Sequence, residues 1–240
     1  MNWFSDWFNS KYYHVLYNNR DEKEAQVFID NLMFHLKIKK GSKLIDIACG
    51  KGRHATYFNS LGLDVVGIDL SPNSITSAKR NKNETLQFVV HDMRKIYQKN
   101  HFDIATNLFT SFGYFDTYKD EQKAINTMAS NLKPGGLLII DFKNITKVIA
   151  NLVESECKII NGITFNIKRK VENEMIIKDI YIKHGGTKQH FQEKVKAISL
   201  ETFTKLISKA ELKIIDIFGN YKLEDFNAMA SSRLILVCRK

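Results

Sequence analysis

Proline and cysteine are both scarce in this sequence of 240 residues. With two prolines and no Gly/Ser-rich stretch, the chain offers no candidate for a flexible linker, so we expect one continuous domain over residues 1–240. The three cysteines, Cys49, Cys157 and Cys238, lie far apart and form no C-x-x-C pair. This spacing argues against a disulfide framework and against a zinc site. It suits a reducing compartment, and we predict a cytoplasmic protein.

Long apolar runs and metal-ligand patterns are missing as well. No stretch approaches the roughly 20 apolar residues of a membrane span, so we expect no contact with a membrane. The aromatic residues 1–17 lack a basic start and an unbroken apolar centre, unlike a signal peptide. The seven histidines show no metal-ligand spacing, and we predict no metal.

Acidic residues are outnumbered, since 36 Lys and Arg stand against 26 Asp and Glu and give a formal net charge of +10. Such a charge can steer anionic partners such as nucleic acid. The lysines are nevertheless spread along the chain, and the densest cluster is only Lys168-Arg169-Lys170. That distribution is more typical of a solvated cationic surface, so a nucleic-acid partner is unfavoured but stays open.

Short apolar segments alternate with helical ones up to about residue 155. The alternation indicates right-handed crossovers and a parallel sheet covered on both faces. From about 156 to 198 the sequence is β-rich and broken by turn signals, which predicts a small antiparallel insertion. The predicted strands are 43–48, 64–69, 86–90, 102–106, 136–141, 212–218 and 233–239, the helices include 21–37, 53–61 and 199–210, and the turns of the insertion are 161–162, 172–174 and 185–186.

A glycine-rich segment follows the first predicted strand, where residues 50–55 read GKGRHA and fit G-x-G-x-x-A. Glycines let the backbone approach a ligand, and a helix N-terminus offers free N–H groups. Asp69, at the end of the next strand, can accept both ribose hydroxyls. The pattern predicts a nucleoside site and is shared by dinucleotide dehydrogenases. Asp46, inside the first strand, favours a cationic sulfonium nucleoside over a pyrophosphate, unless loop N–H groups simply satisfy it.

Four further segments extend this pattern. LIDIACGKG is similar to the first signature of class I S-adenosylmethionine-dependent methyltransferases, VVGIDLSPNSI to the second, HDM at 91–93 to the third, and LKPGGLLIIDF to the turn and fifth strand. The chain thus resembles this family, in particular small-molecule enzymes like those of methyltransferase domain 25. The resemblance implies S-adenosylmethionine as cofactor and S-adenosylhomocysteine as product. It also implies an α/β fold with a Rossmann-like, seven-stranded, mainly parallel sheet, helices on both faces and an antiparallel last strand. The small antiparallel β insertion after strand 5, predicted from the turn signals, would be added to this fold.

The resemblance assigns most of the cofactor contacts to the motif residues. Asp69 binds the ribose, Asp92 the adenine amino group, and the backbone of Met93 the edge of the ring. We expect Cys49 to contribute through its backbone and not as a nucleophile. The other cofactor-binding residues expected in the motifs are Asp46, Ala48, Gly50, Gly52, Leu70, Asn107 and Leu108.

The N-terminal segment YYHVLYNNRD is similar to the part of small-molecule N-methyltransferases, sugar-amine enzymes included, that folds over the cofactor. By that analogy one of Tyr12 or Tyr17, together with Arg20, holds the methionine carboxylate, since an Arg–carboxylate contact is charge-assisted and directional. The alternative is that the aromatic residues and Arg20 are structural. We therefore divide the domain into an N-terminal helical lid (1–40), a cofactor-binding core (41–155), inserted antiparallel strands (156–198), and a closing helix with strands (199–240).

Residues 107–115 follow the fourth strand, at the sheet edge where α/β proteins bind ligands. Amino methyltransferases of DNA or protein glutamine carry N/D-P-P-Y/F here, whereas this chain reads NLFT, which argues against those acceptors. Four aromatic residues either wall an acceptor pocket or pack beneath the sheet, namely Phe109, Phe112, Tyr114 and Phe115. The candidate general bases are His14, His190, Tyr114 and Glu193, and none stands out. The insertion either covers this pocket, which we favour, or forms the surface of a homodimer.

The sequence thus predicts a methyltransferase acting on a small-molecule acceptor, with an amine as the favoured acceptor. Its first rival is an RNA methyltransferase, suggested by the charge of +10. A rival of another class is a non-catalytic nucleoside-binding or dimerisation module. A dehydrogenase is the weakest alternative.

Overall fold

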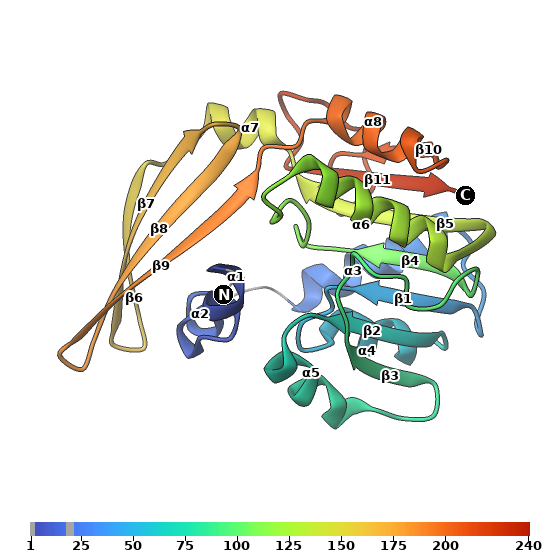
Figure 1. The fold of residues 1–240 in the computed structure, drawn as a ribbon, viewed down its shortest axis with the longest axis horizontal. Helices are drawn as coiled ribbons and strands as arrows, with labels where there is room; N and C mark the ends of the chain where they lie inside the picture. Colours follow the sequence, from blue (N-terminus) through green and yellow to red (C-terminus); the bar gives the residue numbers. More distant parts are fainter. Residues whose placement is uncertain (1–2, 18–21) are drawn as a thin grey trace.

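The computed structural model describes residues 3–17 and 22–240, and two β-sheets organise it (Figure 1). The strands of the larger sheet are β1 (Lys43–Ile47), β2 (Asp64–Asp69), β3 (Leu86–Val90), β4 (Phe102–Asn107), β5 (Leu132–Lys143), β10 (Lys213–Phe218) and β11 (Arg233–Arg239). Their order across this seven-stranded sheet is β10-β11-β5-β4-β1-β2-β3. The pairs among β1 to β5 are parallel, whereas β11 is antiparallel to both of its neighbours. The predicted fold is therefore confirmed.

Helices cover both faces of this sheet, and two apolar cores lie beneath them (Figure 1). Phe28 and Phe58 are buried in the core of one face, and Phe142 and Phe203 in that of the other. The first face carries α3 (Glu22–His35), α4 (Arg53–Ser60) and α5 (Pro72–Ala78), with the short η1 (Lys79–Asn81) after it, and the second carries α6 (Tyr118–Asn131) and α8 (Leu200–Lys209). Because both faces are covered, β1 is buried at every position from Leu44 to Ile47.

Hydroxyl side chains cap the N-termini of three of these helices. The side chain of Ser71 accepts a hydrogen bond from the Ser74 N–H, with Pro72 at the first helical position of α5. Thr117 caps α6 in the same way, and Ser199 caps α8. These caps fix where the chain turns back from the carboxyl ends of the strands.

The smaller sheet is the predicted antiparallel insertion, and it follows β5 after the short helix α7 (Ile145–Ala150). It has the strand order β6-β7-β8-β9. Residues with positive φ form its turns, at 161–162, 173–174 and 185–186, where asparagine and glycine tolerate that conformation best. The strands are β6 (Ser155–Ile160), β7 (Ile163–Glu172), β8 (Met175–His184) and β9 (Thr187–Lys196).

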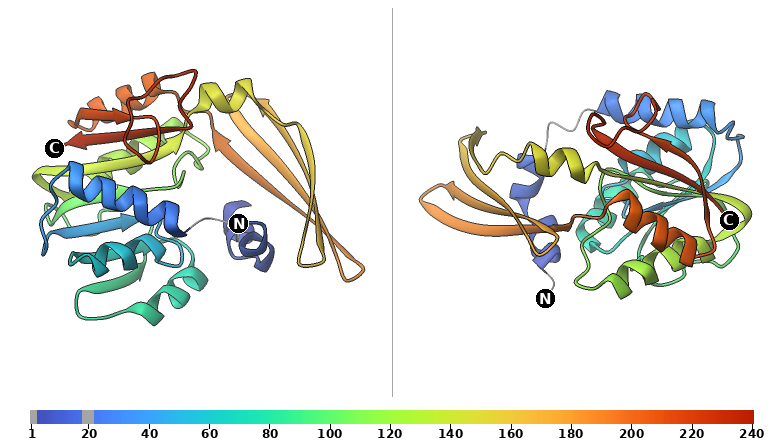
Figure 2. Two further views of the ribbon diagram at one scale, coloured as in Figure 1. Left: turned by 180° about the vertical axis from the view of Figure 1, so that it is seen from behind. Right: turned by 90° about the horizontal axis from the view of Figure 1, so that it is seen from above.

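Two short N-terminal helices, α1 (Trp3–Phe8) and α2 (Lys11–Leu16), lie between the two sheets (Figures 1 and 2). Trp7 and Tyr12 pack with Phe165 and Ile180 of the smaller sheet in a third apolar cluster. The smaller sheet therefore buries its apolar face against the N-terminal helices.

Within the described ranges, no helix is long and apolar enough to cross a membrane. No group of three or more metal-ligating side chains occurs among the residues described.

Candidate functional site

A cavity of about 450 Å³ lies at the carboxyl ends of β1, β2, β3 and β4 and is closed on one side by residues of α1 and α2. Loops at this edge are the usual ligand sites of open α/β sheets. Most of the predicted site residues meet here. Those that line the cavity are Tyr17, Asp46, Ala48, Cys49, Gly50, Asp69, Leu70, Asp92, Met93, Leu108, Phe109, Phe112, Tyr114 and Phe115.

Three predicted residues lie off the cavity wall. The Tyr12 ring packs in the cluster against the smaller sheet, and its hydroxyl lies 3.4 Å from His184 Nδ1. The Asn107 side-chain amide donates to the Ile47 carbonyl at 3.0 Å, so it ties β4 to β1. Gly52 begins α4, and an added Cβ would lie 2.4 Å from the Phe88 ring, so its role is close packing. Arg20 lies outside the described residues.

The glycine-rich turn presents its backbone to the cavity. Gly50 has φ of 57°, and a Cβ built there meets no atom within 4 Å, because that side of the turn is open. Its amide donates to Asp69 Oδ2 at 2.9 Å, which links the turn to the end of β2. A side chain at Gly50 would therefore enter the space that a ligand needs, and its positive φ would be strained.

Asp46 is a buried carboxylate on the floor of the cavity, with 1% of its surface exposed. Its Oδ1 accepts a hydrogen bond from the Thr106 hydroxyl at 3.0 Å, while Oδ2 has no hydrogen-bond partner in the part of the chain that is described. Burial raises the pKa of Asp46 to about 7, although the Thr106 hydrogen bond, the nearby Ala55 backbone amide and the charge of Arg53 oppose that shift. An unsatisfied buried carboxylate is unfavourable, and a cationic ligand group would satisfy it.

Asp69 is held rigidly, because each of its carboxylate oxygens accepts a hydrogen bond from a backbone amide. Gly50 donates to Oδ2 at 2.9 Å and Ser71 to Oδ1 at 2.7 Å. Burial raises the pKa of this carboxyl, and the hydrogen bonds from the two backbone amides oppose that rise. Ser71 supplies the N-cap of α5, so Asp69 is not needed for that role. The lone pairs of Asp69 that accept no backbone amide are therefore available to a ligand.

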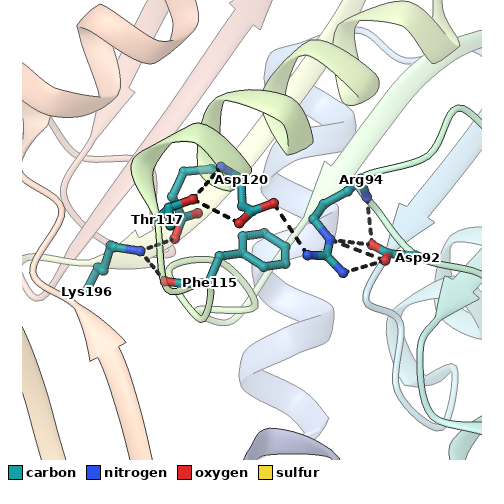
Figure 3. Close-up of polar contacts among 7 residues, drawn as sticks. Asp92, Arg94, Phe115, Thr117, Asp120 and Lys196 are labelled. Carbon is teal, nitrogen blue, oxygen red and sulfur yellow. Dashed lines mark hydrogen bonds and ion pairs between the residues drawn. The ribbon is translucent and has the colours of Figure 1, made fainter. Parts of the chain in front are cut away.

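Asp92 is bound by Arg94, a cavity residue that the sequence analysis missed (Figure 3). The guanidinium donates from Nε at 3.1 Å and 3.2 Å and from Nη2 at 2.7 Å. Burial would raise the pKa of Asp92, but the hydrogen bonds and charge of Arg94 outweigh burial and lower it. The Asp92 carboxylate is therefore ionised and fixed in orientation beside the cavity. The sequence feature that could have identified Arg94 is local, since an Arg two residues after the Asp of the HDM motif can fold back onto that Asp.

Aromatic side chains from the N-terminal helices form the opposite wall. The Phe8 ring centroid lies 5.0 Å from that of Tyr13 and 5.5 Å from that of Tyr114, and the centroids of Tyr13 and Tyr17 are 5.0 Å apart. All four of these residues line the cavity. The sequence pattern does not distinguish Phe8 and Tyr13 as site residues, because an aromatic N-terminal segment is equally typical of a core.

The loop after β4 is strained at Phe109 and Thr110, which have φ of 58° and 63°. Asp141 holds this loop through two hydrogen bonds. The Phe109 amide donates to the Asp141 carboxylate at 2.8 Å, and the Thr110 amide donates to the Asp141 backbone carbonyl at 2.9 Å. Arg233 bonds Asp141 at 2.7 Å and the Thr110 hydroxyl at 3.0 Å. Such backbone strain persists only where the surroundings over-determine it, and here it presents Phe109 to the cavity against the His54 ring.

The candidate bases are mostly remote from the cavity. His190 pairs with Asp179 at 2.8 Å on an exposed part of the smaller sheet. Glu193 accepts hydrogen bonds from Trp7 at 2.6 Å and from Tyr17 at 2.6 Å and 2.8 Å. Tyr114 lines the cavity, with its hydroxyl donating to the Thr110 carbonyl at 2.7 Å. The side chain of His14 lies outside the described part of the chain.

The expectation that the insertion itself covers the pocket was wrong in detail. Among the described residues, none of the strands β6 to β9 contributes to the cavity wall. The cover is formed by Phe8, Tyr13 and Tyr17, and the smaller sheet supports these helices from behind through Glu193 and its apolar face.

Comparison with known proteins agrees with this geometry. Residues 38–211 match the family model described as a methyltransferase domain. The chain belongs to this methyltransferase family. Among its relatives, a dTDP-3-amino-3,4,6-trideoxy-alpha-D-glucopyranose N,N-dimethyltransferase of Streptomyces venezuelae is 33% identical over 42% of this chain and 43% of the relative. A glycine/sarcosine N-methyltransferase of Parasynechococcus marenigrum is 31% identical over 55% of this chain and 48% of the relative.

The chain spans about half the length of the curated relatives that it matches. Solved structures extend the likeness of fold over almost all of it. An S-adenosylmethionine-dependent methyltransferase from Clostridium acetobutylicum superposes with a TM-score of 0.79 at 18% identity, covering 95% of each chain. The amino pentose methyltransferase CalS10 of Micromonospora echinaspora, solved with S-adenosylmethionine bound, gives 0.72 at 17% identity and covers 96% of this chain and 97% of its own.

Proposed function

We propose that this protein is an S-adenosylmethionine-dependent methyltransferase that methylates the amino group of a small molecule. The observation that carries the proposal is the buried Asp46, whose Oδ2 has no partner in the described structure, next to the open glycine turn. Oxygens of this kind attract cations and repel phosphates. This argues for a sulfonium nucleoside and against the dinucleotide of a dehydrogenase.

The residues of the cavity fit that cofactor. Asp46 would hold its cationic amino-acid end, the Gly50 backbone would lie along it, and Asp69 would bind the ribose with its remaining lone pairs. Asp92 and Met93 would meet the adenine, and Asp92 would have to share with it the oxygens to which Arg94 already donates. Of the two tyrosines, we assign the cofactor side to Tyr17, because it lines the cavity and Tyr12 does not.

The bound cofactor supplies an electrophilic methyl group. The protein has to align an acceptor with it and exclude water. The aromatic wall of Phe8, Tyr13 and Tyr114 meets both needs, since it is apolar and its ring faces attract the cationic form of an amine. The amine gives up a proton to solvent before its neutral nitrogen attacks the methyl group, and the C–S bond breaks as the N–C bond forms. Amine acceptors appear in the names of the N,N-dimethyltransferase and glycine/sarcosine relatives, which supports the same choice.

We further propose that the N-terminal lid, core, insertion and closing segments act as one unit, because lid and insertion share an apolar cluster. All three cysteines are unbonded, which supports a reducing compartment such as the cytoplasm. A homodimer stays a prediction.

The test is transfer of a labelled methyl group. Purified protein would be incubated with methyl-labelled S-adenosylmethionine and, separately, glycine, sarcosine, a dTDP-linked amino sugar, and total RNA. We expect label in at least one small amine and none in RNA. Label in RNA alone, or cofactor binding with no transfer to any amine in cell extract, would contradict the proposal.

A further inference from the structure

A buried ion pair lies directly behind the acceptor-side loop of the cavity. Lys196, the last residue of β9, is 5% exposed, and Glu121, in the first turn of α6, is 0% exposed. Lys196 Nζ lies 3.4 Å from Glu121 Oε1. Burial raises the pKa of Glu121 to about 7, against the opposing effect of Lys196 and of the Phe115 and Gly113 amides. A buried pair of this kind contributes little net stability, so its placement calls for another explanation.

Lys196 ties the loop of residues 112–115 to the smaller sheet at two points, once through its backbone and once through its side chain. The Lys196 amide donates to the Gly113 carbonyl at 2.8 Å. Its ammonium group donates to the Phe115 carbonyl (Figure 3). It also donates to Glu121. Gly113 has φ of 85°, and an added Cβ would lie 3.4 Å from Val195, so the loop packs closely on β9.

The other side of the same loop faces the ligands. Phe112, Tyr114 and Phe115 line the cavity. The Phe115 ring lies under the Arg94 guanidinium, 5.0 Å from its centroid, and Arg94 bonds Asp92 and reaches Asp120 at 3.5 Å (Figure 3). A shift of this loop would therefore move the acceptor wall first, and the Arg94 contact next.

From this arrangement we propose that Lys196 and Glu121 are positioning residues, which use the smaller sheet to set the place of the acceptor wall formed by residues 112–115. The inference rests on the proposed function. It also gives the insertion a defined task, since β9 then fixes both walls. Glu193 holds Tyr17 of the cover together with the neighbouring Trp7, and Lys196 holds the loop opposite.

The test compares the wild type with Lys196→Met and with the double variant Lys196→Met/Glu121→Gln. The double variant leaves no unpaired buried charge, so it folds even where the single variant does not. Lys205→Met is the matched control, because Lys205 makes an exposed pair with Glu201 at 2.7 Å. We expect hydrogen exchange of a peptide spanning 112–117 to speed up by about tenfold in both Lys196 variants, with peptides of β1 and β2 unchanged.

Steady-state kinetics supply the second measurement, with glycine or the dTDP-linked amino sugar as the probe, whichever the wild type methylates. We expect KM for that amine to rise about tenfold in the double variant, while its melting temperature and its Kd for S-adenosylhomocysteine stay near the wild-type values. Unchanged exchange at 112–117, or a wild-type KM in a double variant of wild-type stability, would overturn the proposal. If the wild type methylates no amine, the proposed function fails, and the exchange measurement still decides whether the pair positions the loop.

Discussion

The acidic side chains of the cavity differ in how much of their hydrogen-bonding capacity is already used. Asp69 accepts two backbone amides, and Asp92 is held by Arg94. Asp46 accepts one hydroxyl and keeps one oxygen without a partner in the described ranges. Ionisation of Asp46 in the free protein is therefore unfavourable, and a bound cation would reverse this.

Ligand binding should consequently depend on pH through Asp46. Burial raises its pKa to about 7, so below that pH the free protein holds a proton that a cationic ligand must displace. We expect Kd for S-adenosylhomocysteine, measured by calorimetry, to weaken by about tenfold from pH 8 to pH 6. An affinity that is the same at both values would contradict the role of Asp46.

Asp46→Asn is the control for that experiment. It should bind weakly and without pH dependence, because the titrating group is gone. The folded pKa of Asp46 lies above its ordinary value of 3.8, so its ionisation lowers stability as pH rises from about 4 through 7. At pH 8 we therefore expect a higher melting temperature for Asp46→Asn than for the wild type.

The sequence motifs predicted the polar half of the site better than the apolar half. Gly50 and Asp69 could be placed because each follows directly from a strand end, and parallel strands end at one edge. Phe8 and Tyr13 could not, since their position depends on packing against the smaller sheet, far away in sequence. Tyr12, the alternative to Tyr17, lies off the cavity wall, because a helix turns neighbouring residues to different faces and Tyr12 packs against that sheet.

Among the structural elements, the loop after β4 carries the clearest strain. Two consecutive residues, Phe109 and Thr110, have positive φ, which is unfavourable for residues with a Cβ. Asp141 at 0% exposure and Arg233 hold them in place. The backbone conformation of this loop thus depends on one buried carboxylate in β5.

Replacing that carboxylate should loosen the loop and the fold together. We expect Asp141→Asn to lower the free energy of unfolding by about 3–5 kcal/mol, because it leaves Arg233 buried without a counter-charge. Asp103→Asn is the matched control, as Asp103 pairs with Lys133 at 2.7 Å on a surface where both side chains are well exposed. Urea denaturation measures the free energy of unfolding of both variants. Equal, small losses in the two variants would contradict the role given to Asp141.

Element positions were predictable where local patterns determine them. The turns at 161–162, 173–174 and 185–186 lie at the predicted breaks, since glycine and asparagine accept positive φ there. β5 begins at Leu132 and not at the predicted residue 136, since residues around the Pro-Gly-Gly turn still pair with β4. The placement of α1 and α2 between the sheets was not predictable, because no local pattern specifies a partner more than a hundred residues away.

The net charge of +10 has no role in the proposed function. Several cations are already paired, among them Arg94 with Asp92 and Lys133 with Asp103. The cavity itself holds the carboxylates of Asp46, Asp69 and Asp92. Lys51, Arg53 and Arg94 line the same cavity and balance these carboxylates, so the lining offers no excess positive charge to a phosphate backbone.

The RNA rival can be tested through its dependence on salt. We expect any binding of an RNA oligonucleotide to be weak at 50 mM salt and lost by about 200 mM, as for non-specific attraction. S-adenosylhomocysteine should not strengthen it. Filter binding measures both effects, and tight, cofactor-dependent RNA binding at 200 mM salt would favour the rival.

The central claim is that the glycine turn beside Asp46 binds S-adenosylmethionine. Calorimetric titration of S-adenosylhomocysteine into the wild type and into Gly50→Val, with NAD titrated in parallel, tests it most directly. We expect saturable binding to the wild type, none to a folded Gly50→Val, whose side chain would enter the open side of the turn, and no binding of NAD. Binding of NAD alone, or equal binding of S-adenosylhomocysteine to both proteins, would contradict the claim.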